Sequence, residues 1–427
     1  DLASRLSNGA SPMSLLADLL STLIDRRLPV LGGVRADDRS TEMLCRDLIG
    51  TLGEVTGYAV ARQILDSYEA MKDSEKHAFF RFLNNEMDID TDVVMAATTA
   101  YAADGSVVNF RQLMKTAEAP RQELARRLNQ VPGATARIVA MRNGLLRFMK
   151  TDTELAKLDA DLQHLLSSWF NRGFLVLRPI NWESPAHILE KIIAYEAVHA
   201  IDSWDDLRRR LQPTDRRCFG FFHPAMPDEP LIFVEVALTK GILGSIQSVL
   251  SEKRAPLSPT QADTAVFYSI SNCQAGLAGI SFGNSLIKQV VGDLSSALPQ
   301  IDTFVTLSPI PGLMRWLTDK KIADRVDDPD ILRALATHYL LEAKRDDGLP
   351  RDAVARFHLN NGASVHEVHA GADLSDNGRA QSGGAMVNYL YDLGRITENH
   401  EAFATSQKVA SSAALRTLAR KTLTVAA

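Results

Sequence analysis

The chain has 427 residues, of which 45% are hydrophobic and 23% are charged, and its formal net charge at pH 7 is -5. This length exceeds what one hydrophobic core usually supports, so two domains are expected. The net negative charge does not indicate nucleic-acid binding, for which an excess of basic residues is typical. No stretch of apolar residues approaches the roughly 20 that span a bilayer.

The three cysteines, Cys45, Cys218 and Cys273, are far apart and odd in number. They predict free thiols in a reducing compartment rather than a disulfide framework, and without a CxxC pair they offer no zinc site. The first residues lack the continuous apolar core of a signal peptide, and the last, TLTVAA, carry no Ser-Lys-Leu peroxisomal address. We therefore expect a soluble, cytoplasmic protein.

From residue 11 to about residue 168, apolar residues recur at three- and four-residue spacing, which is typical of amphipathic helices. The segments SPMSLLADLLSTLIDRRL and ELAKLDADLQHLLSSWF illustrate this pattern, and alternating strand patterns are absent. We predict that residues 1–168 form an all-helical domain. Helical domains of this size often mediate self-association, so a homo-oligomer built partly through residues 11–168 is expected.

The pattern changes near Trp169. The first predicted strand is GFLVLRPI, and later strands are RCFGFFHP, LIFVEVALTK, AVFYSIS and TFVTLSPI, with helices such as SPAHILEKIIAYEAVHAI and NSLIKQVVGDLSSAL between them. A late strand is predicted at ASVHEVHAG, whereas GAMVNYLYDL is predicted to be helical. Strands that alternate with helices predict a mixed α/β domain on one sheet over residues 169–427.

A glycine-rich loop, SNCQAGLAGISFGNS, joins the strand AVFYSIS to the next helix and has glycines at positions 276, 279 and 283. Glycines let a backbone approach a ligand closely, and a helix start presents unpaired N–H groups, so this loop can bind a pyrophosphate. The pattern is neither GxGxxG nor a Walker loop. A purely structural turn explains it equally well.

Ser308 ends an apolar strand and is followed at once by Pro-Ile-Pro-Gly. It is not the serine of a GxSxG elbow, because glycine is missing on both sides. His358 lies between an apolar approach and an Asn-Asn-Gly turn, where it can donate a hydrogen bond to an oxyanion or deliver a proton near neutral pH. Taken alone, each residue is explained more simply as structural.

Tyr389 and Tyr391 lie two positions apart, so on a helix one can belong to the core while the other faces a cleft. His366 and His369 lack the spacing of a zinc-protease helix, so no metal site is expected there. These polar residues at the ends of elements indicate a ligand cleft without naming the ligand.

Four segments of the second half occur in the order FYSISNCQAGLAGISFGNSLIK, LSPIPG, FHLNNGA and NYLYDLG, with HPAMPDEPLIFVEVALTKGI upstream. In this combination the chain resembles the malonyl-CoA decarboxylase family, from roughly Trp169 to Arg395. The resemblance implies an all-α N-terminal helical domain followed by a GNAT-like mixed α/β catalytic domain without acetyl-transfer activity. It also implies conversion of malonyl-CoA to acetyl-CoA and carbon dioxide without metal, biotin or another prosthetic group.

The family's motifs imply roles for particular residues. The serine of SPIPG and the histidine of FHL carry catalysis in the family, which corresponds to Ser308 and His358. A tyrosine of NYxY near the active site corresponds to Tyr391. The loop and helix start after YSIS hold the CoA pyrophosphate in the family, which places four residues near it: Gln274, Gly276, Gly279 and Gly283.

Ser281 stands where some members carry an acidic residue, and we assign it no role. Without a peroxisomal signal, a bacterial-type cytoplasmic enzyme is favoured. We expect Ser308 to orient the substrate carboxylate, while His358 polarises the thioester oxygen or supplies a proton. The Pro-Ile-Pro-Gly sequence would hold the serine hydroxyl in place in advance.

Two other functions fit the same residues. An acyl-CoA-dependent N-acyltransferase can use the same fold, since a fold alone does not determine chemistry. A non-catalytic CoA-binding scaffold would use the long helical half as its working surface. The first would release thiol from acetyl-CoA in the presence of amines, and the second would bind CoA without turnover.

Overall fold

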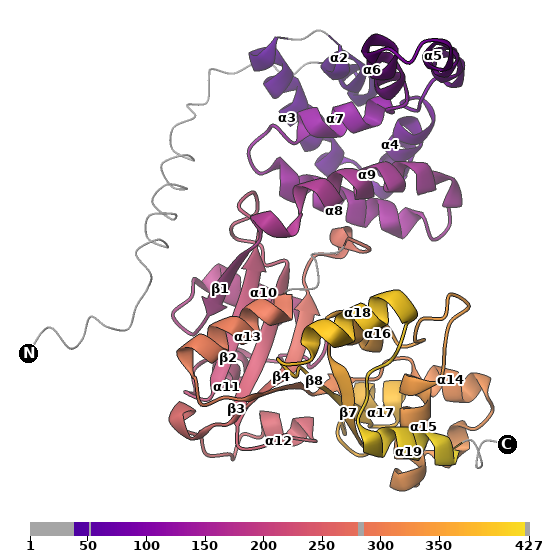
Figure 1. The fold of residues 1–427 in the computed structure, drawn as a ribbon. Helices are drawn as coiled ribbons and strands as arrows, with labels where there is room; N and C mark the ends of the chain where they lie inside the picture. The colour runs from indigo at the N-terminus through magenta and orange to yellow at the C-terminus, as the bar shows by residue number, and fades with distance from the viewer. Residues whose placement is uncertain (1–37, 51–52, 281–285, 423–427) are drawn as a thin grey trace, which may run out of the picture. The chain divides into compact units, whose positions relative to one another are not determined.

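The computed structural model describes residues 38–50, 53–280 and 286–422 of the chain (Figure 1). The chain divides into two compact units, residues 1–134 and 135–427. The last helix before the first strand ends at Trp169. The boundary predicted at residue 168 therefore coincides with the change from helix to strand and not with the division between the compact units.

The described part of the first unit is helical. Its helices are α2 (Thr41–Ile49), α3 (Glu54–Ala70), α4 (Asp73–Asn85), α5 (Thr91–Ala103), α6 (Val107–Thr116) and α7 (Pro120–Leu128). Polar side chains cap several of them: Ser40 accepts from the Met43 N–H group, and Asp90 accepts from the Val93 N–H group. The predicted helix SPMSLLADLLSTLIDRRL lies outside the described residues.

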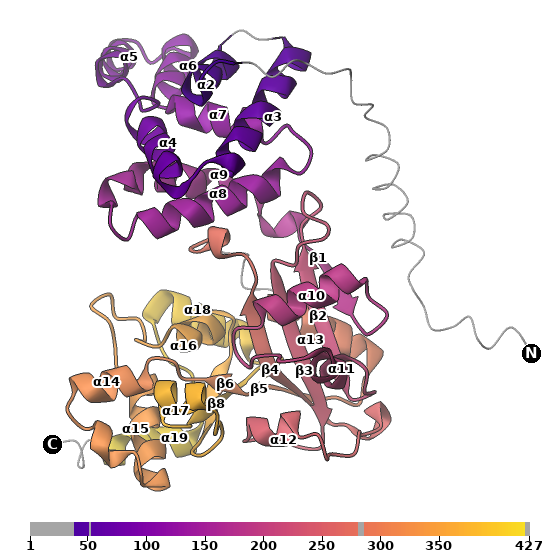
Figure 2. The ribbon, with the colours of Figure 1, turned by 180° about the vertical axis from the view of Figure 1, so that it is seen from behind.

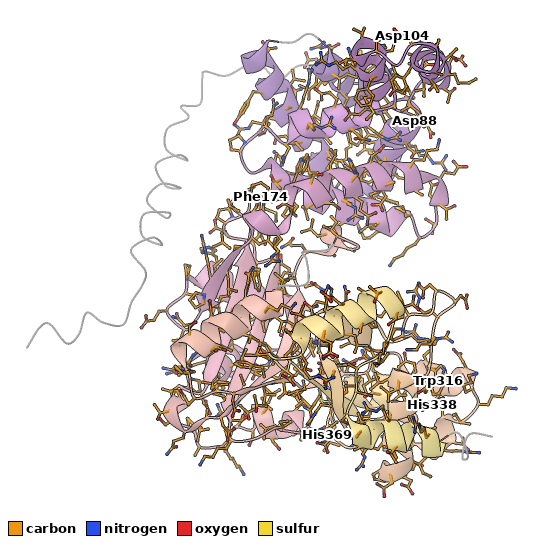
Figure 3. The ribbon with its side chains drawn as sticks, viewed as in Figure 1. Asp88, Asp104, Phe174, Trp316, His338 and His369 are labelled. Carbon is orange, nitrogen blue, oxygen red and sulfur yellow. The ribbon has the colours of Figure 1, made fainter. Side chains whose placement is uncertain are left out.

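A buried arginine ties this unit together. Arg121 of α7 donates to the Asn84 carbonyl at 3.0 Å and pairs with Asp88 at 2.9 Å, while only 6% of it is exposed. Figure 3 labels Asp88 beside the helices of this unit. A buried guanidinium is tolerated because its donors are satisfied by a carboxylate and a carbonyl.

The second unit begins with nearly all of α8 (Ala134–Phe148) and with α9 (Ala156–Trp169), and continues into a sheet. The strands of this sheet are β1 (Val176–Ile180), β2 (Arg216–Phe222), β3 (Ile232–Thr239), β4 (Thr264–Asn272), β5 (Thr303–Thr306), β6 (Ser308–Pro309), β7 (Ser364–His369) and β8 (Met386–Leu390). Their order is β1-β2-β3-β4-β5-β8-β6, and β7 pairs with β8.

Helices surround this sheet on both faces (Figure 2). They are α10 (Ala186–Tyr195), α11 (Trp204–Leu211), α12 (Ile246–Leu250), α13 (Leu286–Ala297), α14 (Leu313–Asp319), α15 (Pro329–Leu341), α16 (Ala353–Asn360), α17 (Asp376–Ser382), α18 (Ile396–Ser406) and α19 (Ala413–Thr422). The strands predicted at GFLVLRPI, RCFGFFHP, LIFVEVALTK, AVFYSIS and ASVHEVHAG are confirmed.

Alternation along the strands distributes side chains to the two faces of the sheet. On β2, Phe219 and Phe221 pack in the same cluster as the apolar face of α13, whereas Cys218 and Phe222 pack with α10 and α11. Figures 1 and 2 accordingly show α13 on one face of the sheet and α10 on the other. The largest core therefore lies on the α13 face, where α14, α15, α16, α18 and α19 also contribute.

The sheet opens between β4 and β6. Strands β4 and β5 pair in parallel from Thr264 opposite Thr303 to Phe267 opposite Thr306, and the Leu307 N–H group donates to the Phe267 carbonyl at 2.9 Å. Beyond this point β4 continues to Asn272, while β6 pairs with β8. The register shifts between the pairs Glu235–Ser269 and Val236–Phe267, which leaves Tyr268 of β4 as a bulged residue without a partner on β3. Such an opening is where a ligand can enter a sheet.

Candidate active site

Ser308 lies on the two-residue strand β6, directly after the short strand β5. It faces Val387 of β8 across the antiparallel pair. Because strand side chains alternate, Ser308 and Thr306 point to the same face of the sheet. The Ser308 hydroxyl donates to Thr306 Oγ1 at 2.8 Å, and only 6% of Ser308 is exposed.

His358 comes from the last turn of α16. Asp352 caps the start of this helix, and its carboxylate accepts from the Ala355 N–H group at 2.8 Å. Only 2% of His358 is exposed. Its Nε2 lies 3.1 Å from Ser308 Oγ. The helix and the strand thus bring together a serine and a histidine that are 50 positions apart.

Tyr389 and Tyr391 show that the helical prediction for GAMVNYLYDL is wrong. Residues Met386–Leu390 form β8, and the Tyr391 N–H group that follows donates to the Phe304 carbonyl at 2.8 Å. Residues two apart on a strand share a face, so both rings reach His358. The Tyr391 hydroxyl lies 2.8 Å from His358 Nδ1, and the Tyr389 ring stacks on the imidazole with centroids 4.5 Å apart.

Thr306, Ser308, His358 and Tyr391 therefore form one hydrogen-bonded series, which we call the Ser–His–Tyr network. Sequence reasoning singled out three of its members and missed Thr306. The signal for Thr306 was its position two residues before Ser308 on a predicted strand, which places both hydroxyls on one face.

Burial determines the charge state of this network. It lowers the pKa of His358 to about 3 and raises the pKa of Tyr391 well above its usual value. At neutral pH the imidazole is therefore uncharged and the phenol keeps its proton. A neutral imidazole has one donor and one acceptor nitrogen. With Ser308 donating to Thr306, His358 Nε2–H donates to Ser308 and His358 Nδ1 accepts from Tyr391.

A cavity of about 200 Å³ is lined by residues that follow Ser308 along the chain, while Ser308 itself is not one of its lining residues. Its walls include Pro309 of β6 and Pro311, which follows this strand, and Ala197 and Val198, which follow α10. The Ala197 N–H group donates to Ser271 Oγ of β4 at 3.4 Å. The cavity is thus bounded by a segment attached to β4 and by the segment that contains β6, the two strands between which the sheet opens.

Glu196 holds the wall of this cavity in place, and sequence reasoning missed it. Its carboxylate accepts from the N–H groups of Val198 and His199 at 2.7 and 2.9 Å, and from the Ser269 hydroxyl at 2.7 Å. The Glu196 side chain therefore stabilises the turn that follows α10 and links this segment to β4. Nothing in the residue pattern alone connected Glu196 with Ser269, because 73 positions separate them.

The glycine-rich loop lies apart from the Ser–His–Tyr network. Gln274 donates to the Pro230 carbonyl at 3.1 Å, and the Gly276 carbonyl accepts from Arg142 at 2.8 Å. The Gly279 carbonyl accepts from Gln163 at 3.1 Å. Gly283 lies outside the described residues. The part predicted for these four residues in binding pyrophosphate remains a prediction.

Several N–H groups of this loop are already used within it. Those of Leu277, Ala278 and Ile280 donate to the carbonyls of Gln274, Ala275 and Leu277 at 2.9 to 3.1 Å. They form a single 3-10 turn over Ala275–Leu277 and its continuation. Because these amides are occupied, the loop offers fewer free donors to an anion than the glycine pattern suggested.

Within the described ranges, no group of three or more His, Cys, Asp or Glu residues is arranged to hold a metal ion. Cys45, Cys218 and Cys273 are buried free thiols, in agreement with their spacing. Among the helices of the described residues, none has the length and apolar character needed to cross a membrane.

The chain is a two-part protein: a helical N-terminal region precedes a mixed α/β sheet domain that contains a buried Ser–His–Tyr network. The model of the malonyl-CoA decarboxylase C-terminal domain matches residues 173–328 and 316–426, and that of the N-terminal domain matches residues 88–170. The chain belongs to the malonyl-CoA decarboxylase family. The resemblance and the fold class predicted from the sequence are therefore confirmed.

Curated relatives agree with this assignment. The chain is 32% identical over 371 residues to the mitochondrial malonyl-CoA decarboxylase of Anser anser anser, with 75% of this chain and 73% of the relative covered. It is 33% identical over 337 residues to the mitochondrial enzyme of Rattus norvegicus, with 67% of this chain and 68% of the relative covered.

Solved structures of bacterial proteins are more similar still. The malonyl-CoA decarboxylase of Rhodopseudomonas palustris is 46% identical with a TM-score of 0.85, covering 88% of this chain and 98% of that one. The malonyl-CoA decarboxylase of Agrobacterium vitis is also 46% identical, with a TM-score of 0.84 and coverage of 89% and 99%.

Proposed function

We propose that this chain converts malonyl-CoA to acetyl-CoA and carbon dioxide through the Ser–His–Tyr network. The observation that carries the proposal is the buried contact of 3.1 Å between Ser308 Oγ and His358 Nε2, one residue before Pro309 of the cavity wall. Membership of the malonyl-CoA decarboxylase family supports the reaction type. The network supplies hydrogen-bond donors in a site shielded from water, which this reaction requires.

The chemistry begins with cleavage of the bond between the α-carbon and the carboxylate of the malonyl group. The electron pair moves into the thioester carbonyl, which becomes an enolate oxygen, and carbon dioxide leaves. A hydrogen-bond donor aimed at such a developing oxyanion lowers the activation free energy by about 3 to 4 kcal/mol. The enolate then takes a proton at the α-carbon, and collapse of the enolate gives acetyl-CoA.

Ser308 is the member of the network that meets the malonyl thioester in this proposal. Both ring nitrogens of His358 are hydrogen-bonded to protein side chains, and the ring is more deeply buried than Ser308. His358 therefore acts through Ser308 rather than on the substrate itself. This assignment differs from the expectation from sequence, in which Ser308 orients the carboxylate and His358 polarises the thioester oxygen or supplies a proton.

The proton transfers balance in this arrangement. The Ser308 hydroxyl turns from Thr306 to the enolate and gives its proton to the α-carbon, while the Nε2–H group of His358 keeps its hydrogen bond to Ser308 Oγ. A solvent proton then restores the Ser308 hydroxyl, so His358 keeps its Nε2–H tautomer and Tyr391 keeps its proton. The net reaction consumes one solvent proton per carbon dioxide released. A neutral imidazole suits this exchange, because it can donate at one nitrogen while it accepts at the other.

We further propose that no metal, biotin or other prosthetic group takes part. The thioester carbonyl of the substrate accepts the electron pair, so the substrate provides its own electron sink. Dialysis against a chelator should leave turnover unchanged within about twofold. Loss of activity that returns on adding a divalent metal would overturn this part of the proposal.

The decisive experiment follows acetyl-CoA and carbon dioxide production from malonyl-CoA by the wild type, Ser308→Ala and His358→Ala. Each variant should lose about two or more orders of magnitude in kcat. His338→Ala serves as a control, because His338 is not a member of the network. Its ring packs against Trp316 with the ring centroids 5.9 Å apart (Figure 3). A wild type that binds CoA and leaves malonyl-CoA intact would refute the proposed reaction.

The loop that contains Gln274, Gly276, Gly279 and Gly283 is proposed to lie against the CoA pyrophosphate. Its position directly after β4, where the sheet opens, supports this assignment. Binding of CoA should then be at least about tenfold tighter than binding of pantetheine, which lacks the pyrophosphate. Equal affinities, measured by calorimetry, would contradict it.

Self-association through residues 11–168 is a further proposal, with a second copy of this chain as the partner. In its support, α5 and α6 expose large apolar side chains: Met95 at 68%, Val107 at 64% and Val108 at 75%. Large apolar side chains exposed on neighbouring helices are typical of interaction sites. Sedimentation at micromolar concentration should show an oligomer that Val108→Lys weakens. A wild-type monomer would refute the proposal.

We also propose that the protein works in the cytoplasm. Its three buried free thiols fit a reducing compartment. The relatives from goose and rat are named as mitochondrial enzymes, so fractionation of the source cells with a compartment marker tests this location directly. Recovery with an organelle would overturn it.

A further inference from the structure

Arg142 of α8 is one of the most deeply buried charged side chains of the second unit, with 2% of it exposed. Its Nη1 donates to the carbonyls of Gly276 and Ala278 at 2.8 and 2.9 Å. Its Nε pairs with the Asp159 carboxylate of α9 at 2.7 Å. A single guanidinium therefore joins two helices to the glycine-rich loop.

The loop is shaped to lie on these helices. A Cβ atom at Gly276 would come within 1.9 Å of the Val139 carbonyl oxygen of α8, so only glycine fits there. Gly279 has a φ of +78°, and its carbonyl accepts from Gln163 of α9 at 3.1 Å. Within four residues, the carbonyls of Gly276, Ala278 and Gly279 all turn toward α8 and α9.

We propose that Arg142 is a positioning residue for the binding of acyl-CoA, which it controls by holding residues 274–280 in one conformation. The inference rests on the proposed function, in which this loop meets the nucleotide part of CoA. Charge-assisted hydrogen bonds from a buried guanidinium are among the strongest that a loop can receive. A loop ordered in advance loses less conformational entropy when the ligand binds.

Arg142 is expected to affect the binding of CoA and not the chemical step. Arg142 and the Ser–His–Tyr network share no hydrogen bond among the described residues, so loosening the loop should weaken CoA binding without slowing the chemical step. For Arg142→Gln we expect the KM for malonyl-CoA to rise by about tenfold or more, while kcat changes by less than about threefold. Arg142→Lys keeps the charge and should recover part of the lost affinity.

A truncated substrate distinguishes this role from general damage to the fold. The malonyl thioester of N-acetylcysteamine carries the reacting group but lacks the nucleotide. Wild type and Arg142→Gln should have equal kcat/KM with this substrate, within about twofold. A variant whose fold is merely damaged would lose activity on both substrates by the same factor, and that result would overturn the proposal.

Arg121 offers a matched control. It is a buried helical arginine that also bonds a carbonyl and a carboxylate, but it belongs to the first unit. Arg121→Gln should leave the KM for malonyl-CoA within about twofold of wild type. If Arg142→Gln does not fold, Gln163→Ala removes only the bond to Gly279 and should raise the KM about two- to threefold.

Calorimetric titration with CoA keeps this inference separate from the reaction itself. If the wild type fails to turn over malonyl-CoA, the proposed reaction fails, and the inference is then judged by CoA affinity alone. Weaker CoA binding by Arg142→Gln than by Arg121→Gln would support it. Equal affinity of wild type and Arg142→Gln for CoA would overturn it.

Discussion

The Ser–His–Tyr network and the loop of residues 274–280 are built in opposite ways. The network joins Thr306, Ser308, His358 and Tyr391 from separate elements through side-chain hydrogen bonds. The loop is held by its main-chain carbonyls, which α8 and α9 bind through Arg142 and Gln163. In the network, side chains bond to one another. In the loop, glycines without a side chain allow the backbone to lie close to α8 and α9.

This difference shows that similar sequence signals can arise from different physical requirements. A serine, a histidine and a set of glycines near the ends of elements all looked like parts of one cleft. The polar residues do meet one another, while Gly276 is explained by its closeness to the Val139 carbonyl. A glycine in a loop therefore reports tight backbone packing as readily as ligand binding.

The largest effect that would sharpen this comparison is on stability. Gly276→Ala forces a methyl group against the Val139 carbonyl oxygen at 1.9 Å, so we expect a loss of about 3 kcal/mol in the free energy of unfolding. Urea denaturation measures it. Gly292→Ala is the matched control, since a Cβ atom there meets no atom within 4 Å and helix α13 should gain up to about 1 kcal/mol. Equal stabilities of the two variants would mean that the loop is not packed tightly.

The next effect is on catalysis, at the far end of the network. Tyr391→Phe removes the hydroxyl that bonds His358 Nδ1, so kcat should fall about tenfold, equivalent to about 1.4 kcal/mol. Tyr389→Phe is the control: its hydroxyl has no hydrogen-bond partner among the described residues, and the variant keeps the ring that stacks on His358. Comparable losses in both variants would show that the network ends at His358.

The smallest effect concerns pH. Because burial lowers the pKa of His358 to about 3, the imidazole stays neutral, and kcat/KM should show no limb from it between about pH 5 and 8. An acidic limb near pH 6.5 that disappears in His358→Gln would contradict this. The same shift affects stability. A depressed histidine pKa contributes stability above about pH 6.5, and this contribution is lost as pH falls toward 3.

The predictions from sequence succeeded where the signal is local. Apolar periodicity predicted the helices of the first unit and the strands of the sheet, because a residue's burial there depends on its neighbours along the chain. The prediction failed at GAMVNYLYDL, which forms β8. Its apolar residues can be arranged on a helix or a strand, and only pairing with β7 and β6 selects the strand.

The site was predicted in part for the same reason. The motifs around Ser308, His358 and Tyr391 were sufficient to name the three residues and the family. Thr306 and Glu196 were not found, because their importance depends on which side chains the fold places beside them. Arg142 was not found either, since 134 positions separate it from the Gly276 carbonyl that it binds.

By itself, the sequence determined the family, the change from helix to sheet near Trp169 and three residues of the network. The tertiary structure alone decided that Ser308 and His358 lie 3.1 Å apart, that the imidazole is buried and neutral, and that α8 and α9 hold the glycine-rich loop. The reason is that motifs and periodicity are properties of neighbouring residues. Distances, burial and pKa values depend on contacts between segments that only folding brings together.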